Sequence, residues 1–317
     1  MKSVFLLYII TFFLFTLISC SRQEKEFTIG YLQLTDDRAL DEARMGVIES
    51  LKRAGFEEGK NIKISYKNAQ GDIANIPLIL QSFSYEGADL IITSTTPCML
   101  GALQFVKNIP VVFTVAFSPE QVGIKNPPSN LTGVYDPIDM NEFLNIMNEI
   151  KPVSRLGIIF NSSETNAILG RDRLKSECLK QNITLEEAAI TNSSEVFQAA
   201  SSLAHKKVDA FAVATDNTVN SALESVVKVS LKSGIPIYDT EPSHVRKGAL
   251  AGLGINNYTW GIESGKLAAR IIKGEKPENI PMVKLTDKKL ILNQSVAKKI
   301  GMSFPDNLIK IANEIIE

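Results

Sequence analysis

The chain has 317 residues, with 34 basic and 35 acidic side chains and a hydrophobic content of 44%. This balance excludes the basic surplus typical of nucleic-acid-binding proteins, and no long run of like charges suggests an interaction tail. The length is ample for a substantial hydrophobic core and favours two lobes over one.

The first 20 residues have the pattern of a secretory leader. Lys2 precedes an apolar run from Val4 to Ile18, which ends at Ser19 and Cys20. A short apolar run that follows a basic start and ends at a small residue is typical of a signal peptide. Because Cys follows at once, the segment resembles a bacterial lipobox. We expect residues 1–20 to be a lipoprotein signal, with cleavage before Cys20.

A lipid on the thiol of Cys20, palmitate among its acyl chains, would anchor the mature protein to a membrane outside the cytoplasm. The sequence leaves open whether this is an inner or an outer membrane. An uncleaved transmembrane helix is the alternative, but the apolar run is shorter than the roughly 20 residues that span a bilayer.

Residues 21–26 form a short charged tether, after which strands and helices alternate. The first part predicts strands at 27–32, 61–66, 89–92 and 110–113, separated by helices at 40–54, 73–85 and 97–106. The pattern then restarts, with helices at 140–150, 167–181, 194–205 and 218–233 and strands at 155–160, from 183, at 208–213 and at 235–238. The tail adds strands at 248–255 and 289–292 and helices at 258–272, 295–300 and 307–316.

Strands separated by helical segments of this length form βαβ units and parallel sheets. We therefore expect an α/β fold with two Rossmann-like lobes, each a mostly parallel sheet flanked by helices, joined by a three-crossover hinge. Lobe 1 would contain 27–136 plus about 256–282, and lobe 2 about 137–255 plus 283–317. With Cys20 lipidated, Cys98 and Cys178 are expected to be free, buried thiols.

Polar side chains follow many of these strands, where open α/β sheets collect their ligands. Hydroxyls and free N–H groups at helix starts suit a carboxylate, and acidic side chains on the opposite lobe suit an ammonium group. A cleft that offers both is complementary to a free amino acid. Each Ser or Thr could instead be a helix N-cap, as could Asp216, and Glu241 could form a hinge salt bridge.

Several residues are expected to have structural roles. We expect His244 to be a surface histidine of the hinge, and Trp260 to pack in the core or at the cleft rim, rather than contact a ligand. His205 and His244 are the two histidines, and neither has metal-ligand spacing. The chain has no nucleophile elbow, phosphate loop or dinucleotide fingerprint. We therefore expect no metal, no cofactor and no catalytic activity.

The mature chain resembles the ABC-transporter substrate-binding protein family that includes the tryptophan-binding lipoproteins, with the periplasmic-binding-protein type I fold. The resemblance covers nearly all of 27–301. It rests on the order and spacing of several short segments, among them Ala39-Leu40-Asp41, Glu58-Gly59-Lys60-Asn61, Thr96-Pro97, Asn130-Leu131-Thr132-Gly133-Val134, Thr215-Asp216-Asn217-Thr218-Val219 and Gly274-Glu275-Lys276-Pro277.

The resemblance implies a monomeric, lipid-anchored solute-binding component of an importer, which delivers its ligand to a permease with a cytoplasmic ATPase. An amino acid is the expected ligand, aromatic by family association, while purines, sugars and other small solutes remain alternatives. Carried over residue by residue, the ligand contacts would be Asp36, Thr96, Thr114, Asn161, Ser162, Ser163, Asp216, Asn217 and Glu241.

Because the sequence departs from the family pattern at two places, the resemblance does not determine the identity of the ligand's side chain. Asp36-Asp37-Arg38 stands where the family usually has an acidic residue, His and Pro, and Asn257 stands where an aromatic residue is common. Two other classes of function also remain. One is a sensor or chemoreceptor accessory lipoprotein that binds the same ligand, and the other is an extracytoplasmic enzyme, for which no nucleophile–base pair is found.

Overall fold

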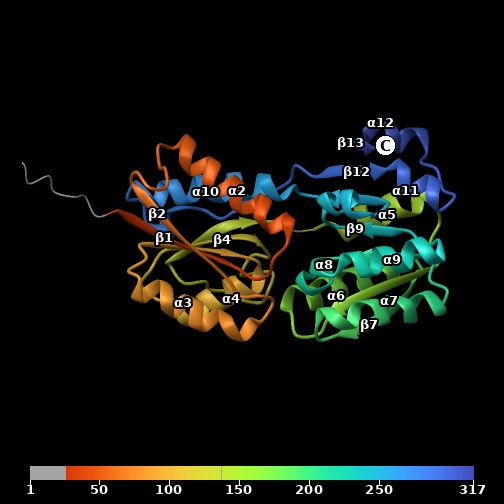
Figure 1. Cartoon of the computed structure of the whole chain (residues 1–317), viewed down its shortest axis with the longest axis horizontal. Helices are drawn as coiled ribbons and strands as arrows, with labels where there is room; N and C mark the ends of the chain where they lie inside the picture. The colour runs from red at the N-terminus through yellow and green to blue at the C-terminus, as the bar shows by residue number, and fades with distance from the viewer. Residues whose placement is uncertain (1–25, 137) are drawn as a thin grey trace, which may run out of the picture.

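The computed structural model describes residues 26–136 and 138–317. The predicted leader, with Cys20 and most of the tether, lies outside the described residues. Two α/β lobes lie side by side along the long axis of the molecule, and the blue C-terminal part of the chain contributes to both (Figure 1).

The first sheet has six strands in the order β11-β5-β4-β3-β1-β2, and every neighbouring pair is parallel. Its strands are β1 (Phe27–Gln33), β2 (Ile62–Asn68), β3 (Leu90–Ser94), β4 (Val111–Ala116), β5 (Leu131–Tyr135) and β11 (Val283–Lys284). All five residues of β3 are buried. This is the pattern of a central strand with helices on both faces.

Helices cover both faces of this sheet. One face packs against α2 (Arg38–Arg53) and α10 (Asn257–Ile272), and the other against α3 (Ile76–Tyr85) and α4 (Thr96–Phe105). Two short 3-10 turns, η1 (Ile73–Asn75) and η4 (Pro277–Asn279), complete the lobe. The side chain of Asp37 caps α2 by accepting a hydrogen bond from the N–H of Ala39.

The second sheet has seven strands in the order β13-β12-β10-β9-β8-β6-β7. Only the β10–β12 pair is antiparallel among the described strands of this sheet. The strands are β6 (Arg155–Asn161), β7 (Thr184–Ile190), β8 (Ala210–Val213), β9 (Ile237–Asp239), β10 (Ala251–Gly254), β12 (Lys289–Asn293) and β13 (Glu314–Ile316).

The helices of the second lobe also form two layers. One layer contains α5 (Met140–Ile150), α6 (Thr165–Lys180), α11 (Gln294–Lys299) and α12 (Asp306–Ile311). The other contains α7 (Val196–His205), α8 (Asn217–Ser221), α9 (Leu223–Ser233) and the 3-10 helix η3 (Pro242–Lys247), with η2 (Ser193–Glu195) before α7. Gly234 ends α9 in the left-handed conformation that glycine adopts most easily.

The chain passes between the sheets three times: after β5, between β10 and α10, and between β11 and β12. The predicted fold class is therefore confirmed, including the return of the long helix to the first lobe. Cys98 in α4 and Cys178 in α6 are both buried, free thiols, also as predicted.

Some predicted elements were wrong. The helix expected at 307–316 ends at Ile311, and β13 follows it. Asn313 is the reason, because its N–H donates to the carbonyl of Leu290 while its side-chain oxygen accepts from the N–H of Leu290. The helix expected at 218–233 is divided at Ala222, and the strands β5, β11 and β13 were not predicted as strands.

The contact between α2 and α10 is unusually close because glycines lie on it. A Cβ atom on Gly261 would lie 1.9 Å from the carbonyl oxygen of Ala43, and one on Gly46 would lie 2.3 Å from the carbonyl oxygen of Tyr258. The two backbones therefore touch, as small residues allow. This contact fixes the N-terminal end of α10, which carries Asn257 and Trp260.

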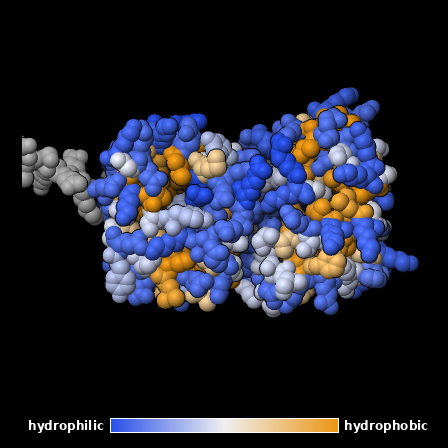
Figure 2. Space-filling model, viewed as in Figure 1, coloured by the Kyte–Doolittle hydropathy of each residue, from blue (hydrophilic) through white to orange (hydrophobic). Residues whose placement is uncertain are grey.

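The face of the molecule seen in Figure 2 is mostly hydrophilic along the junction of the lobes, and its hydrophobic patches lie away from that junction. Within residues 26–136 and 138–317, no helix has the length and apolar character needed to cross a membrane.

We predict that Gly261→Ala destabilises the protein by about 3 kcal/mol, because the added methyl group forces α10 away from α2. Urea unfolding of the chain from Ser21 onward measures this change. Lys266→Ala, on an exposed position of the same helix, is the control and should change stability by less than about 0.5 kcal/mol. Equal effects of the two substitutions would contradict the proposed backbone contact.

Candidate functional site

A cavity of about 110 Å³ lies where the carboxyl ends of strands from both sheets face each other. Its apolar lining includes Leu40 at the start of α2, Phe143 in α5 and Trp260 in α10. Its polar lining comes mainly from loops that follow strands of either sheet. The cavity is therefore in the position that open α/β sheets use for ligands.

Backbone strain is concentrated at this cavity. Seven non-glycine residues of the described chain have positive φ, and four of them line the cavity: Thr95 (95°), Val115 (49°), Ile138 (41°) and Thr215 (48°). All four are β-branched, so the left-handed region is unfavourable for them. Strain of this kind is typical of functional sites, where the surrounding structure holds it in place.

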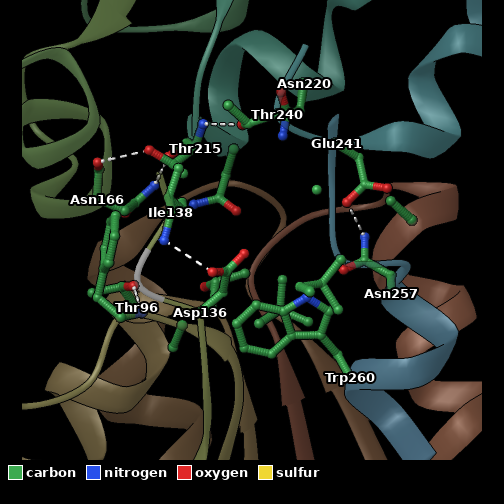
Figure 3. Close-up of a pocket in the computed structure, with 18 of the residues that line it drawn as sticks. Thr96, Asp136, Ile138, Asn166, Thr215, Asn220, Thr240, Glu241, Asn257 and Trp260 are labelled. Carbon is green, nitrogen blue, oxygen red and sulfur yellow. Dashed lines mark hydrogen bonds between the residues drawn. The ribbon is translucent and has the colours of Figure 1, made fainter. Parts of the chain in front are cut away.

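The polar groups form two clusters, which meet where the N–H of Thr215 donates to the hydroxyl oxygen of Thr240 at 3.4 Å (Figure 3). We call the cluster of Thr96, Asp136, Asn166 and Thr215 the Asp136 end, and the cluster of Asn220, Thr240, Glu241 and Asn257 the Glu241 end. In Figure 3 the indole ring of Trp260 lies between them.

The Asp136 end offers both donors and acceptors. Thr96 is the first residue of α4, whose first N–H groups have no partner within the helix. Its hydroxyl oxygen accepts from the N–H of Phe117 at 3.0 Å, which leaves the hydroxyl proton free to donate. Asp136 is 5% exposed, accepts from the N–H of Ile138 at 2.9 Å, and has a pKa raised by burial. The buried side-chain oxygen of Asn166 has no donor in the described chain.

The Glu241 end contains a carboxylate that accepts hydrogen bonds from both lobes. Glu241 precedes η3 of the second lobe, and its Oε2 accepts from Nδ2 of Asn257 of the first lobe at 2.8 Å. Oε1 accepts from the N–H of Ser243 at 3.0 Å. Burial raises the pKa of Glu241 to about 7, although nearby His244 opposes this shift.

An ionic network beside this end also joins the lobes. Lys247 of η3 donates to Oδ1 of Asp37 at 2.9 Å, and Nε2 of His244 lies 3.8 Å from Oδ2 of the same carboxylate. Nδ1 of His244 is 2.8 Å from Oδ2 of Asp239. Burial alone would lower the pKa of His244, but the two carboxylates raise it to about 10.

The surface position expected for His244 was wrong, because the side chain is fully buried. Pro242 and the tight turn of η3 direct its ring between Asp239 and Asp37. Burial alone would raise the pKa of Asp37, but His244 and Lys247 lower it to about 2.

The predicted ligand contacts are distributed unevenly. Thr96, Asn217 and Glu241 line the cavity. Thr114 is buried within β4 outside the lining, whereas Asp36 is exposed and accepts from Nδ2 of Asn68 at 2.7 Å. Ser162 and Ser163 are exposed and also lie outside the lining.

Asp216 and Asn161 belong to a buried capping network behind the lining. Asp216 caps α8 by accepting from the N–H of Val219 at 2.9 Å, and it also accepts from the N–H of Asn161 at 2.6 Å. Glu164 accepts from the N–H groups of Asn217 and Thr218 at the same helix start. Burial, together with the charge of Glu164, raises the pKa of Asp216 to about 7.

Several lining residues were not among the predicted contacts. Asp136 directly follows β5, which was not predicted as a strand, and recognition of the buried run Leu131–Val134 would have indicated it. Asp37 follows Asp36 and lines the cavity in its place. No local sequence pattern predicts the lining residues Asn166, Asn220 and Lys288, because only the tertiary fold brings them to the cavity.

The arrangement suits a small zwitterion with an apolar body. The start of α4 and the Thr96 hydroxyl can bind a carboxylate, and the Asp136 carboxylate and Asn166 oxygen can accept from an ammonium group. The flat ring of Trp260, with Leu40 and Phe143, can enclose the apolar part.

The chain is similar over most of its length to known substrate-binding proteins. The family model "ABC transporter substrate binding protein" matches residues 28–316. A protein named "Tyrosine-binding protein" from Clostridioides difficile is 34% identical over 88% of this chain and 82% of its own length.

Two solved structures have the same fold. An ABC domain in complex with L-Trp from Streptococcus pneumonia has a TM-score of 0.86 and 27% identity, over 92% of this chain and 100% of its own. The ligand-free, open structure of a substrate binding protein with adhesive properties from Clostridium difficile has a TM-score of 0.67 and 33% identity, over 92% of this chain and 99% of its own. Over the whole chain, the structure therefore superposes more closely on the L-Trp complex than on the ligand-free, open structure, despite the lower identity.

We predict that His244→Gln flattens the dependence of stability on alkaline pH. Because the pKa of His244 is raised from its ordinary 6.5 to about 10, its contribution is complete below pH 6.5 and is lost as pH rises through about 10. Between these limits, the wild type should lose on the order of 5 kcal/mol more unfolding free energy than the variant, since each pKa unit between 6.5 and about 10 corresponds to about 1.4 kcal/mol. Urea unfolding across this range measures the difference.

His205→Gln, which changes an exposed histidine, is the matched control and should retain the wild-type slope. An identical slope for wild type and His244→Gln would remove the ionic role assigned to His244.

Proposed function

The chain belongs to the ABC transporter substrate binding protein family, and we propose that it is the extracytoplasmic, lipid-anchored, solute-binding component of an importer. Its ligand is an aromatic amino acid, which it binds in the cavity between the lobes and delivers to a membrane permease with a cytoplasmic ATPase. The names of the similar proteins, one tyrosine-binding and one solved with L-Trp, support this choice of ligand.

One observation carries the proposal. A buried carboxylate, Asp136, lies across from the start of α4 at one end of a cavity whose middle is bordered by Trp260. The α-ammonium and α-carboxylate of an amino acid need opposite partners close together, and this end offers both. An aromatic side chain then lies against the indole, where ring–ring contact adds to burial.

Ligand binding is coupled to closure because several contacts join the two lobes. Besides Asp37 to Lys247, the guanidinium of Arg173 in α6 lies 4.7 Å from the ring centroid of Phe117 after β4. Such contacts exist only when the lobes are close, and a ligand held by both lobes shifts the equilibrium toward this state. The closed form presents a surface made by both lobes to the permease.

The lipid anchor is proposed from the sequence, through acylation of Cys20 after cleavage of the leader. One acyl chain holds a protein only marginally at a membrane, so stable attachment requires a second acyl chain or another membrane-binding signal. We propose that the mature protein is a monomer without cofactor or metal. The family is defined by substrate binding rather than catalysis, which supports a binding role without turnover.

We predict that the chain from Ser21 onward binds tyrosine or tryptophan when titrated with the 20 amino acids, nucleosides and sugars in a calorimeter. A ligand at 100 times its dissociation constant should also raise the unfolding free energy by about 2.7 kcal/mol. Binding of a sugar or nucleoside, with no amino acid bound, would reject the proposed ligand.

Asp136→Asn should weaken amino-acid binding by about 1.5–3 kcal/mol, the range for a hydrogen bond to a charged group. The same calorimetric titration measures this loss. Asp287→Asn, at an exposed position, is the matched control and should bind as tightly as the wild type. Unchanged affinity in Asp136→Asn would exclude its carboxylate as the partner of the ammonium group.

Cys20→Ser should release the protein from the membrane fraction of the expressing cells, because the acylated thiol is lost. Immunoblotting of membrane and soluble fractions measures the change, and Cys178→Ala is the cysteine control that should stay membrane-bound. Retention of Cys20→Ser in the membrane would show that another segment holds the protein there.

A further inference from the structure

The Glu241 end of the cavity contains buried hydrogen-bond acceptors that lack a donor within the described residues. The carboxylate of Glu241 receives the N–H of Ser243 and the Nδ2 group of Asn257. The side-chain oxygens of Asn257 and Asn220 are buried and have no donor in the described part of the chain. A buried acceptor without a donor is costly, so this end is built to receive a donor from elsewhere.

The neighbouring charged groups do not supply that donor. Lys247 is bound to Asp37, and the two ring nitrogens of His244 face Asp239, at 2.8 Å from Nδ1, and Asp37, at 3.8 Å from Nε2. Asn257 is 2% exposed, so bulk water has little access to its amide. The amide orientation is determined by its bond to Glu241, since Nδ2 must face the carboxylate and the oxygen must then face away from it.

The position of this cluster defines which ligand atom reaches it. It lies across the cavity from Asp136 and Thr96, with the ring of Trp260 between (Figure 3). A ligand whose ammonium and carboxylate occupy the Asp136 end therefore extends its side chain past Trp260 toward Glu241 and Asn257. The middle suits an apolar ring, and the far end suits a hydrogen-bond donor on that ring.

We propose that Glu241 and Asn257 accept a hydrogen bond from the ring donor of the bound amino acid, so that the site selects tyrosine or tryptophan over phenylalanine. The inference rests on the proposed function, because it assumes an amino acid held at the Asp136 end. Glu241 and Asn257 then determine which aromatic amino acid binds most tightly.

The two side chains come from different lobes, which gives the donor a second effect. Glu241 belongs to the second lobe and Asn257 to the first, and they already contact each other in this structure. A phenol O–H or an indole N–H at this point is held by both lobes at once. Phenylalanine fills the apolar middle but leaves the oxygen of Asn257 buried without a donor, and it adds nothing to this bridge.

The test is calorimetric titration of the chain from Ser21 onward with tyrosine, tryptophan, phenylalanine and 4-fluorophenylalanine. The last has nearly the shape of tyrosine without its donor. We expect the better of tyrosine and tryptophan to bind at least about tenfold, and up to about 100-fold, more tightly than the two analogues without a donor. In Asn257→Leu, which keeps the size and removes the acceptor, this ratio should fall to less than about threefold.

Asn141→Leu, at an exposed position in α5, is the matched control and should keep the wild-type ratio. Glu241→Gln provides a second check and should weaken tyrosine or tryptophan more than phenylalanine. An equal loss for all ligands would mean that Glu241 only joins the lobes, and would overturn the proposal.

Three further outcomes of the titration distinguish failure of this inference from failure of the proposed function. If phenylalanine binds as tightly as tyrosine and tryptophan, the inference fails while amino-acid binding stands. If lysine or arginine binds more tightly than any aromatic ligand, the cluster is a cation site and the inference also fails. If no amino acid binds, the proposed function itself fails.

Discussion

The backbone contact between α2 and α10 is the constraint on which the rest of the structure depends. α10 reaches the first lobe only after the chain has built most of the second, and it must fit a space already bounded by α2 and the sheet. Gly46 and Gly261 allow this because neither carries a Cβ atom at the contact. The same fit places Asn257 and Trp260 at the cavity, so core packing and ligand binding share one interface.

The buried charged groups of the site are of two kinds: those paired with an opposite charge and those that face the cavity. Asp37, His244, Asp239 and Lys247 form an alternating chain of charges that crosses between the lobes, so none is buried without an opposite partner. The carboxylates of Asp136 and Glu241 instead face the cavity, where burial raises their pKa values. A ligand that supplies donors to these acceptors stabilises the closed arrangement, and this links recognition to the movement of the lobes.

The alternation of strands and helices was predictable because apolar residues recur at different spacings in helices and in strands, and because characteristic residues stand where each element begins or ends. The helix at 140–150 coincides with α5, whose start is capped by Asp139. The C-terminal segment was mispredicted because the spacing of its apolar residues fits a helix. Its last residues instead pair with the edge strand β12, and this pairing cannot be read from the local sequence pattern. Tertiary pairing thus overrode local periodicity at β13. The site was predicted less completely, since Asp36 is exposed and the adjacent Asp37 lines the cavity.

By itself, the sequence determined the fold class, the alternation of elements and the strand ends at which polar residues gather. These follow from periodicity and chain order, which are local properties. Only the tertiary structure decided which polar residues enter the cavity and which serve as caps, as Asn217 and Asp216 illustrate: neighbours in sequence, one lines the cavity and the other caps α8 behind it. The reason is that a helix start directs successive side chains to different sides, and only the opposing lobe defines which side is the cavity.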